Sequence, residues 1–312
     1  MSKKMKVGVI GVGNLGQHHA RIYASLPEVE LIGIVDKDEK RAKNIADKLH
    51  TTVFTSTTEL LDAIDAVSIV VPTPLHFMIA KEATEKKVHC LIEKPITTTL
   101  AEADELIRLA DVNNVLLQVG HIERFNPAII AAHQHVACPK FIEVNRLGPY
   151  SSRVSHIGVV LDLMVHDLDM LLYLTQSEVT SIDAIGTKVF SDFEDIANVR
   201  IKFANGCVAN VSASRVSLKK VRKIRIFQND SYISLNYEKQ NLKIYKKKGA
   251  QLKSIKDVKI LRPRIKKNEP LLLELQDFIK CVNEKTSPLV CGVQGRNALQ
   301  LALDVSKKIA MD

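Results

Sequence analysis

The sequence has no tryptophan, and aromatic residues make up 5% of its 312 residues. No apolar stretch approaches the roughly 20 residues that a membrane-spanning helix needs, so we expect no membrane partner. The five cysteines stand at irregular spacings without a C-x-x-C pair, which argues against a disulfide framework and a zinc site. We therefore expect reduced thiols, a cytoplasmic location and no bound metal. Repeats and low-complexity segments are also missing.

Within residues 1–120, short β-branched runs alternate with amphipathic helical patterns. The runs are "KVGVI", "ELIGIV", "AVSIVV", "VHCLI" and "VLLQV". Helices are predicted from about Asn14, Asp38, Pro74 and Leu100. Although lysines before the first run resemble the start of a signal peptide, the run breaks into glycines and is better explained as a strand. Strands that are apolar throughout and separated by helices indicate a parallel, doubly wound α/β sheet covered on both faces.

The pattern changes in residues 121–312, which we predict to form a second, α+β domain. Runs with a period of two, such as "VRIKF", "CVANVSAS", "KIRIFQ" and "YISLNY", are joined by Asn-Gly, Asn-Asp and Lys-Gly turns. They indicate an antiparallel sheet, with a helix over 158–174 inserted near its start. Helical spacing returns from Pro270 and again over 298–310. Whether these last helices pack back on the first domain is left open.

A glycine-rich segment, "GVGNLG", follows the first predicted strand and opens a helix. In that context its glycines let the backbone approach a pyrophosphate, and Asp36, at the end of the second strand, accepts hydrogen bonds from the adenosine ribose. This is a dinucleotide-binding Rossmann pattern, with a tight turn without ligand as the alternative. Asp36 favours NAD over NADP, although Lys37 and Arg41 lie nearby. The predicted cofactor contacts here are Gly11, Gly13, Asn14, Leu15, Gly16, Asp36 and Lys37.

Two further motifs end parallel strands, at the edge where open α/β sheets bind ligands. "VPTPLH" supplies Thr73, Pro74 and His76, and "EKP" supplies Glu93 and Lys94, all predicted as cofactor contacts. The proline after Lys94 keeps this lysine out of helical geometry, so its ammonium can project over the sheet edge. In isolation, Lys-Pro after a strand more often marks the boundary of a loop.

Together, the motifs resemble the glucose-fructose oxidoreductase, inositol dehydrogenase and rhizopine-catabolism family, Gfo/Idh/MocA. "GVIGVGNLGQHHA", "VPTPLHFMIAKEA", "CLIEKPITTTLAEADELI", "GHIERFNPAI" and "GVVLDLMVHDLDMLLYL" occur in family order over essentially the whole chain. The resemblance implies a second domain with a large open-faced mixed sheet, through which homodimers or homotetramers form. It also implies that Lys94, Asp162 and His166 meet at the nicotinamide.

The chemistry of alcohol oxidation agrees with these three residues. Asp162 and His166 lie one helical turn apart on one face, with Asp169 a further turn along and Asp167 pointing elsewhere. Oxidation needs hydride loss to nicotinamide and proton loss to a base, so we predict His166 as general base, with Asp162 as its companion. Lys94 polarises the oxygen and helps relay its proton. The alternative is a structural helix; for Asp167 and Asp169 we prefer salt bridges or caps between domains.

The segments "GHIERFNPAI", "RLGPY" and "GVVLDLMVHDLDM" resemble the branch assigned to UDP-N-acetylglucosamine 3-dehydrogenases. That resemblance implies oxidation of the sugar at C3 to a 3-keto sugar, which is later aminated for lipid A biosynthesis. Predicted sugar or diphosphate contacts are Arg124, Asn126 and Arg153, because guanidinium groups suit phosphate oxygens; surface ion pairs are the alternative. The rival functions are a dehydrogenase of a free sugar or cyclitol, of the inositol type, and a non-catalytic NAD-binding regulator.

Positive charge concentrates in residues 215–267, which hold 18 Lys or Arg and three Asp or Glu, whereas the whole chain carries +9. Such a stripe suits nucleic acid or an anionic membrane. The lysines alternate with β-forming residues, and few aromatics accompany them. This arrangement favours a solvated sheet edge protected by lysines, so we expect no nucleic-acid partner.

Overall fold

A computed structural model describes residues 4–151, 157–249 and 254–310 of the chain. The chain divides into two compact units. The first comprises Met1–Ile122 and Leu271–Leu299, and the second comprises Glu123–Pro270 and Gln300–Asp312. The helical segments after residue 270 are therefore shared between the units.

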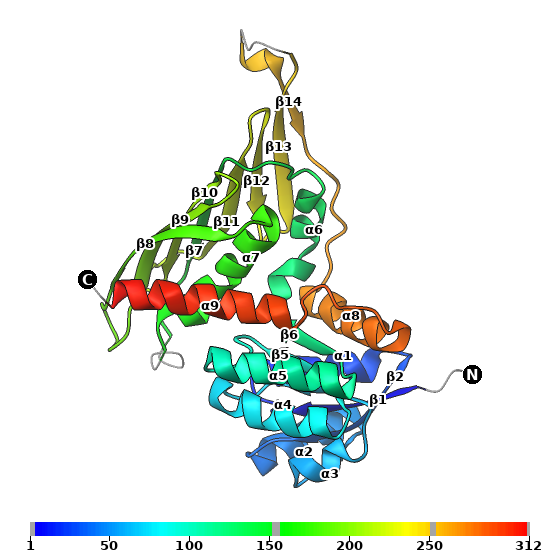
Figure 1. Cartoon of the computed structure of the whole chain (residues 1–312). Helices are drawn as coiled ribbons and strands as arrows, with labels where there is room; N and C mark the ends of the chain where they lie inside the picture. Colours follow the sequence, from blue (N-terminus) through cyan, green and yellow to red (C-terminus); the bar gives the residue numbers. More distant parts are fainter. Residues whose placement is uncertain (1–3, 152–156, 250–253, 311–312) are drawn as a thin grey trace. The chain divides into compact units, whose positions relative to one another are not determined.

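The first unit contains a parallel sheet, as predicted, and this sheet has six strands, one more than the five predicted runs (Figure 1). Its strands are β1 (Met5–Ile10), β2 (Val29–Val35), β3 (Thr52–Val53), β4 (Ala66–Ile69), β5 (His89–Glu93) and β6 (Leu117–Gly120). Their order is β3-β2-β1-β4-β5-β6. Successive strands are added on one side of β1 up to β3 and on its other side from β4 onward, so the strand order switches between β1 and β4. Ligands of open α/β sheets bind at such a switch point, outside the carboxyl ends of the strands.

Helices cover both faces of this sheet. They are α1 (Gly16–Ser25), α2 (Glu39–Leu49), α3 (Thr57–Leu61), α4 (His76–Glu85), α5 (Leu100–Asn113), α8 (Pro270–Glu284) and the first part of α9 (Gly292–Ile309). Val7 and Val9 of β1 share a core cluster with α1, α2 and α8. Gly8 points the other way, where an added Cβ would meet Leu60 and Ile64 at 2.9 Å. Side chains alternate along a strand, so these contacts define the two covered faces.

Local signals in the sequence explain where the helices begin. Asp38 caps α2 by accepting from the backbone N–H of Arg41. Thr99 and Glu102 form a reciprocal capping box at the start of α5. Such caps satisfy backbone donors that the first helical turn leaves open, and each stabilises a helix by about 1 kcal/mol. Among the described residues, no helix is both long and apolar enough to cross a membrane.

The second unit contains an eight-stranded sheet, mixed but mostly antiparallel, as predicted. Its strands are β7 (Phe141–Leu147), β8 (Val179–Thr187), β9 (Ile196–Phe203), β10 (Val208–Ser214), β11 (Val221–Phe227), β12 (Ser231–Asn236), β13 (Asn241–Lys247) and β14 (Val258–Leu261). Their order is β14-β13-β12-β11-β7-β10-β9-β8. β7 and β10 form the parallel pair.

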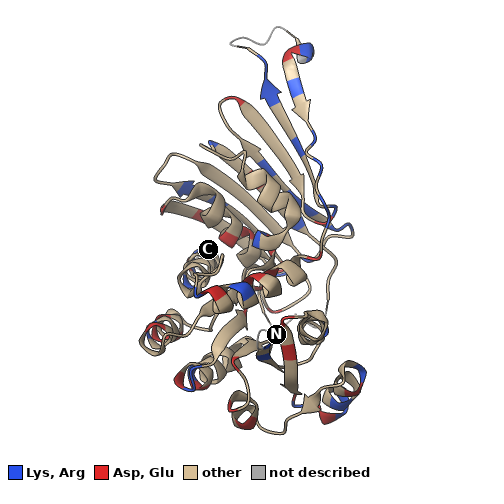
Figure 2. Cartoon of the chain, turned by 90° about the vertical axis from the view of Figure 1, so that its right-hand side faces the viewer, with Lys and Arg blue, Asp and Glu red and all other residues tan. Residues whose placement is uncertain are grey.

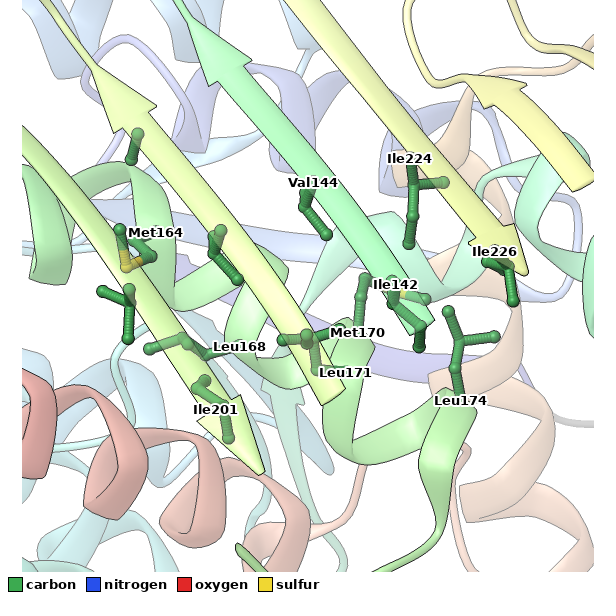
Figure 3. Packing of buried hydrophobic residues seen from close by; sticks show 14 of the residues in the cluster. Ile142, Val144, Met164, Leu168, Met170, Leu171, Leu174, Ile201, Ile224 and Ile226 are labelled. Atoms are coloured by element: carbon green, nitrogen blue, oxygen red, sulfur yellow. The ribbon is translucent and has the colours of Figure 1, made fainter. Parts of the chain in front are cut away.

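One face of this sheet packs on helices α6 (Pro127–His133) and α7 (Val165–Thr175) and on the end of α9. Figure 3 shows Ile142 and Val144 of β7 with Ile224 and Ile226 of β11 in the same apolar cluster as Leu168 of α7. The alternate residues of the strands lie on the other face and, apart from Ser214 at the end of β10, are half-buried or exposed. This alternation holds α7, which carries the predicted catalytic histidine, on one side of the sheet.

Candidate active site

The glycine-rich turn after β1 has the geometry that a dinucleotide needs. Gly11 adopts φ +86°, and a Cβ there would lie 2.3 Å from the carbonyl oxygen of Val70. A Cβ on Gly16 would lie 1.8 Å from the carbonyl oxygen of Gly11, whereas Gly13 faces open space. Within the described residues 14–25, the N-cap residue Leu15 makes no side-chain cap to α1, and the first turn holds no acidic residue. The turn therefore suits a pyrophosphate. The other predicted contacts, Asn14 and Leu15, are exposed on the same turn.

Asp36 lies at the carboxyl end of β2, one strand from this turn. Its Oδ2 accepts from the N–H of Val12 at 2.7 Å, and its Oδ1 accepts from the N–H of Asp38 at 2.9 Å and from Nη2 of Arg41 at 2.7 Å. Partial burial opposes ionisation, but these hydrogen bonds, first that of Arg41, hold the pKa of Asp36 below its usual value. The carboxylate is thus ionised and fixed beside the turn, as a ribose-binding group must be. Lys37 next to it is exposed.

The "VPTPLH" segment forms a short 3-10 turn, η1 (Thr73–Leu75), leading into α4. Thr73 is half-buried and Pro74 is exposed, but His76 is buried. Its Nδ1 lies 3.0 Å from the carbonyl oxygen of Pro95, and its Nε2 lies 2.9 Å from that of Val71. Burial lowers the pKa of His76. Through these contacts His76 links the loops after β4 and β5. Its contact with the cofactor stays a prediction.

The "EKP" motif lies at the end of β5. Glu93 is buried, its Oε1 is 3.3 Å from Nε2 of His19, and its Oε2 accepts from the N–H of Lys94 at 3.2 Å. Lys94 is half-buried, and the peptide bond between it and Pro95 is cis. Burial opposes ionisation of Glu93, but its contact with His19 lowers its pKa. Sequence reasoning missed His19, although a histidine among the apolar residues of α1 was a visible signal.

The predicted catalytic helix begins as a π-helical turn, η4 (Val160–Met164), and becomes regular α-helix only in α7. The N–H of Val165 donates to the carbonyl oxygen of Val160, five residues back. The expected uninterrupted α-helix over 158–174 is therefore wrong for its first turn. Single π-turns in helices are frequent at functional sites. Asp162 and His166 are half-buried in the second unit, whereas Lys94 belongs to the first.

The other two aspartates of the helix, Asp167 and Asp169, are wholly buried. Arg146 donates to both carboxylate oxygens of Asp167, at 2.6 and 3.0 Å, and Arg124 does the same to Asp169, at 2.9 and 2.6 Å. The predicted salt bridges are confirmed, but all four residues lie within the second unit, so the pairs do not join domains. Such bidentate pairs satisfy buried charges and fix the orientation of α7.

The residues predicted to contact substrate have internal partners where the structure describes them. Arg124 is buried, and its guanidinium lies 4.8 Å from the ring centre of Tyr173. Asn126 caps α6 and donates to the carbonyl oxygen of Tyr237 at 3.1 Å. These contacts favour a structural role, and binding of substrate by both residues stays a prediction. Arg153 lies outside the described residues.

Lysines and arginines of the basic segment lie on strands β11 to β14 and in the segments that connect and follow them, among the basic residues drawn in blue in Figure 2. β14 is an edge strand. Several of these basic residues are paired, as Arg225 is with Glu143 at 3.1 Å and Lys220 with Glu238 at 3.1 Å. In the described part of the chain, no group of three or more His, Cys, Asp or Glu side chains is arranged for a metal ion.

Known proteins similar to this chain agree with the geometry. Residues 5–121 match the oxidoreductase family with an NAD-binding Rossmann fold, and residues 133–233 match the GFO/IDH/MocA C-terminal domain. A UDP-N-acetylglucosamine 3-dehydrogenase from Acidithiobacillus ferrooxidans is 39% identical over 302 residues, covering 96% of both chains. Its solved structure superposes with a TM-score of 0.93 over 99% of this chain and 98% of that one.

More distant relatives act on cyclitols. A scyllo-inositol 2-dehydrogenase from Bacillus subtilis is 28% identical, covering 97% of this chain and 93% of that relative. A myo-inositol 2-dehydrogenase from Thermotoga maritima is 26% identical, covering 98% and 96%. The chain therefore belongs to the Gfo/Idh/MocA family of NAD(P)-dependent dehydrogenases that act on CH–OH groups.

Proposed function

We propose that this enzyme oxidises C3 of UDP-N-acetylglucosamine to the 3-keto sugar, with NAD as hydride acceptor. The observation that carries the proposal is the 39% identity to a UDP-N-acetylglucosamine 3-dehydrogenase along nearly the full length of both chains. The inositol dehydrogenases share 28% and 26%. They make a cyclitol dehydrogenase the second candidate. The resemblance to enzymes of lipid A biosynthesis implies that the ketone is then aminated, and we place this reaction in the cytoplasm.

The proposed chemistry assigns one role to each of three side chains. His166 takes the proton of the C3 hydroxyl, and Asp162 orients its imidazole and stabilises the positive charge that it gains. Lys94 donates a hydrogen bond to the same oxygen and so favours the carbonyl that forms. NAD, when bound, supplies the acceptor for the hydride that leaves C3. The glycine turn and Asp36 hold the cofactor.

The test of the proposal is a substrate panel. NADH formation is followed with UDP-N-acetylglucosamine, N-acetylglucosamine and myo-inositol, and the product is examined for a 3-keto group. We expect NADH with the UDP-sugar and little with the other two. Robust oxidation of myo-inositol without any response to UDP-sugars would establish the second candidate instead.

Cofactor preference gives a prediction that needs no substrate. Asp36 is expected to bind the ribose hydroxyls, and hydrogen bonds to charged groups contribute about 1.5–3 kcal/mol. Asp36→Ala should therefore weaken NAD binding by roughly 10-fold or more and leave NADP binding unchanged or improved, since the carboxylate repels a 2′-phosphate. Fluorescence titration with NADH and NADPH measures both. Equal or tighter NADPH binding by the unmutated protein would contradict the preference for NAD.

Arg41 provides the matching variant, because its Nη2 donates to Oδ1 of Asp36 at 2.7 Å and so uses an acceptor of the same carboxylate. Arg41→Ala should leave NADH binding as strong or stronger and weaken any binding of NADPH. Lys43→Ala, on an exposed position of the same helix, is the control for loss of one positive charge. It should change neither affinity by more than about two-fold.

The open face of the eight-stranded sheet is proposed as the surface through which copies of the chain associate. Phe141, Phe227, Tyr232 and Tyr245 form a row across four neighbouring strands, with ring centres 5.7, 4.9 and 5.1 Å apart. Each ring is half-buried and points away from the unit's own core. Aromatic residues gathered on one open face are typical of interfaces.

We expect the purified protein to be a dimer or tetramer by light scattering, and Tyr232→Lys to yield a smaller species. An unpaired ammonium in the middle of this aromatic row loses its water when two faces meet, which opposes association. Lys43→Glu, which changes an exposed charge in the first unit, should keep the mass of the unmutated protein. A monomeric unmutated protein would contradict the proposal.

A further inference from the structure

A continuous chain of polar side chains is buried inside the first unit, beneath the end of β5. His19 and Tyr23 come from α1, Ser68 from β4 and Glu93 from β5. The hydroxyl oxygens of Tyr23 and Ser68 are 2.9 Å apart, and Nδ1 of His19 lies 3.2 Å from the Ser68 oxygen. Nε2 of His19 lies 3.3 Å from Oε1 of Glu93. Three of the four residues are wholly buried, and Glu93 is 8% exposed.

One assignment of protons uses each donor once. Tyr23 donates to the Ser68 hydroxyl, Ser68 donates to Nδ1 of His19, and Nε2–H of His19 faces Oε1 of Glu93 at 3.3 Å. Burial raises the pKa of Tyr23, so the phenol keeps its proton as a donor. A hydrogen bond to one ring nitrogen determines which nitrogen carries the proton. The tyrosine and serine therefore direct the imidazole N–H toward the glutamate.

The last of these buried polar residues, Glu93, contacts Lys94 of the "EKP" motif. Glu93 Oε2 accepts from the backbone N–H of Lys94 at 3.2 Å. A Cβ on Gly120 would lie 3.0 Å from the Glu93 carboxyl group, so the carboxylate is closely confined on that side too. Burying a carboxylate costs several kcal/mol unless it is paired, and an apolar residue would fill the same space without that cost. A role beyond packing explains why this position is charged.

We propose that His19 is a positioning residue for Lys94 and acts through Glu93. It holds the carboxylate in one orientation, in which the carboxylate binds the Lys94 peptide and places a negative charge near the ammonium. This inference rests on the proposed function, in which Lys94 polarises the substrate oxygen. His19 lies on the helix that the glycine turn opens, so the same contact ties the pyrophosphate turn to the lysine.

Other ionisable groups of the first unit also act on this row of buried polar side chains. His76 of α4 experiences the charge of Glu93, and Glu274 of α8 acts on Tyr23. Glu93 and Lys94 also interact through their charges, because the ammonium favours the ionised carboxylate. The interaction is reciprocal, so removing the carboxylate charge should weaken the hold of the Lys94 ammonium on its proton, whatever the substrate is.

The experiment compares His19→Leu, which removes the donor, with His19→Gln, whose amide can replace Nε2–H. Tyr23→Phe and Ser68→Ala are milder variants that remove single links if His19→Leu does not fold. We expect His19→Leu to lower kcat by about 10-fold or more, with KM for NAD nearly unchanged, and His19→Gln to recover most of the loss. A purely structural role would lower the melting temperature of all variants and leave kcat of the folded protein unchanged.

The pKa of Lys94 is measured separately, by NMR of ¹³C-methylated lysines, with Lys94→Arg to assign the signal. Glu93→Gln and His19→Leu should lower this pKa, and His19→Gln should restore it. An unchanged pKa in folded His19→Leu would overturn the inference. This readout needs no substrate. A lowered pKa together with an inactive UDP-sugar would therefore reject the proposed substrate and keep the positioning role.

Discussion

Replacing His166 with asparagine is expected to lower kcat by about 10²-fold or more at neutral pH, because positioned general bases contribute about 10²–10⁴-fold to a rate. The half-buried imidazole is the proposed acceptor of the hydroxyl proton, and asparagine keeps a polar amide near the position of Nδ1 but cannot take a proton. NADH affinity should change little, because the cofactor turn and Asp36 lie in the other unit. Steady-state kinetics and NADH titration measure both effects.

Two comparisons separate loss of the base from loss of the fold. His135→Asn changes another half-buried histidine of the same unit and should keep kcat within about three-fold. A histidine base is active only when neutral, so turnover of the unmutated enzyme should fall toward acid pH, and this acid limb of the pH profile should vanish in His166→Asn.

Lys94→Met should also lower kcat by at least about 10²-fold, whereas Lys81→Met should not. Near-normal turnover in both His166→Asn and Lys94→Met would leave a structural helix as the explanation.

The parallel sheet could be predicted because its signals are local. β1, β2, β4, β5 and β6 are apolar runs separated by amphipathic helices, and this pattern indicates buried parallel strands without knowledge of their partners. β3, with only two residues, gives no periodic signal. In the second sheet the alternating runs were visible, but the parallel pairing of β7 with β10 depends on residues far apart in the chain.

The candidate site, like the fold, could be predicted only where its signals are local in the sequence. The motif carrying Gly11 and Gly16 was recognisable because one short segment sets the turn. The partners of the buried aspartates were not, because Arg146 and Arg124 lie 21 and 45 residues from Asp167 and Asp169. A π-turn differs from an α-turn by one added residue per hydrogen-bonded loop, which side-chain periodicity over five residues cannot resolve.

The nucleotide of the proposed substrate should contribute to catalysis and not only to affinity. A UDP group binds at a distance from C3, and that remote binding energy can position the reacting carbon against the cofactor. Along the series UDP-N-acetylglucosamine, N-acetylglucosamine 1-phosphate and N-acetylglucosamine, kcat/KM should fall by about 10²-fold or more, and kcat should fall with it. Initial rates of NADH formation over a range of concentrations give both quantities.

The assay must allow for an unfavourable equilibrium, since an accumulating 3-keto sugar can stop net NADH formation after few turnovers. A transaminase that consumes the ketone, or an oxidant that recycles NADH, removes this limit, and bound product is sought by mass spectrometry. If only KM rises when the nucleotide is removed, then UDP binds the ground state and the transition state equally and does not position C3. If instead myo-inositol reacts well and no UDP-sugar does, the enzyme is a cyclitol dehydrogenase. Tight DNA binding with a steep salt dependence, and no alcohol oxidation, would assign the basic residues 215–267 to a non-enzymatic role.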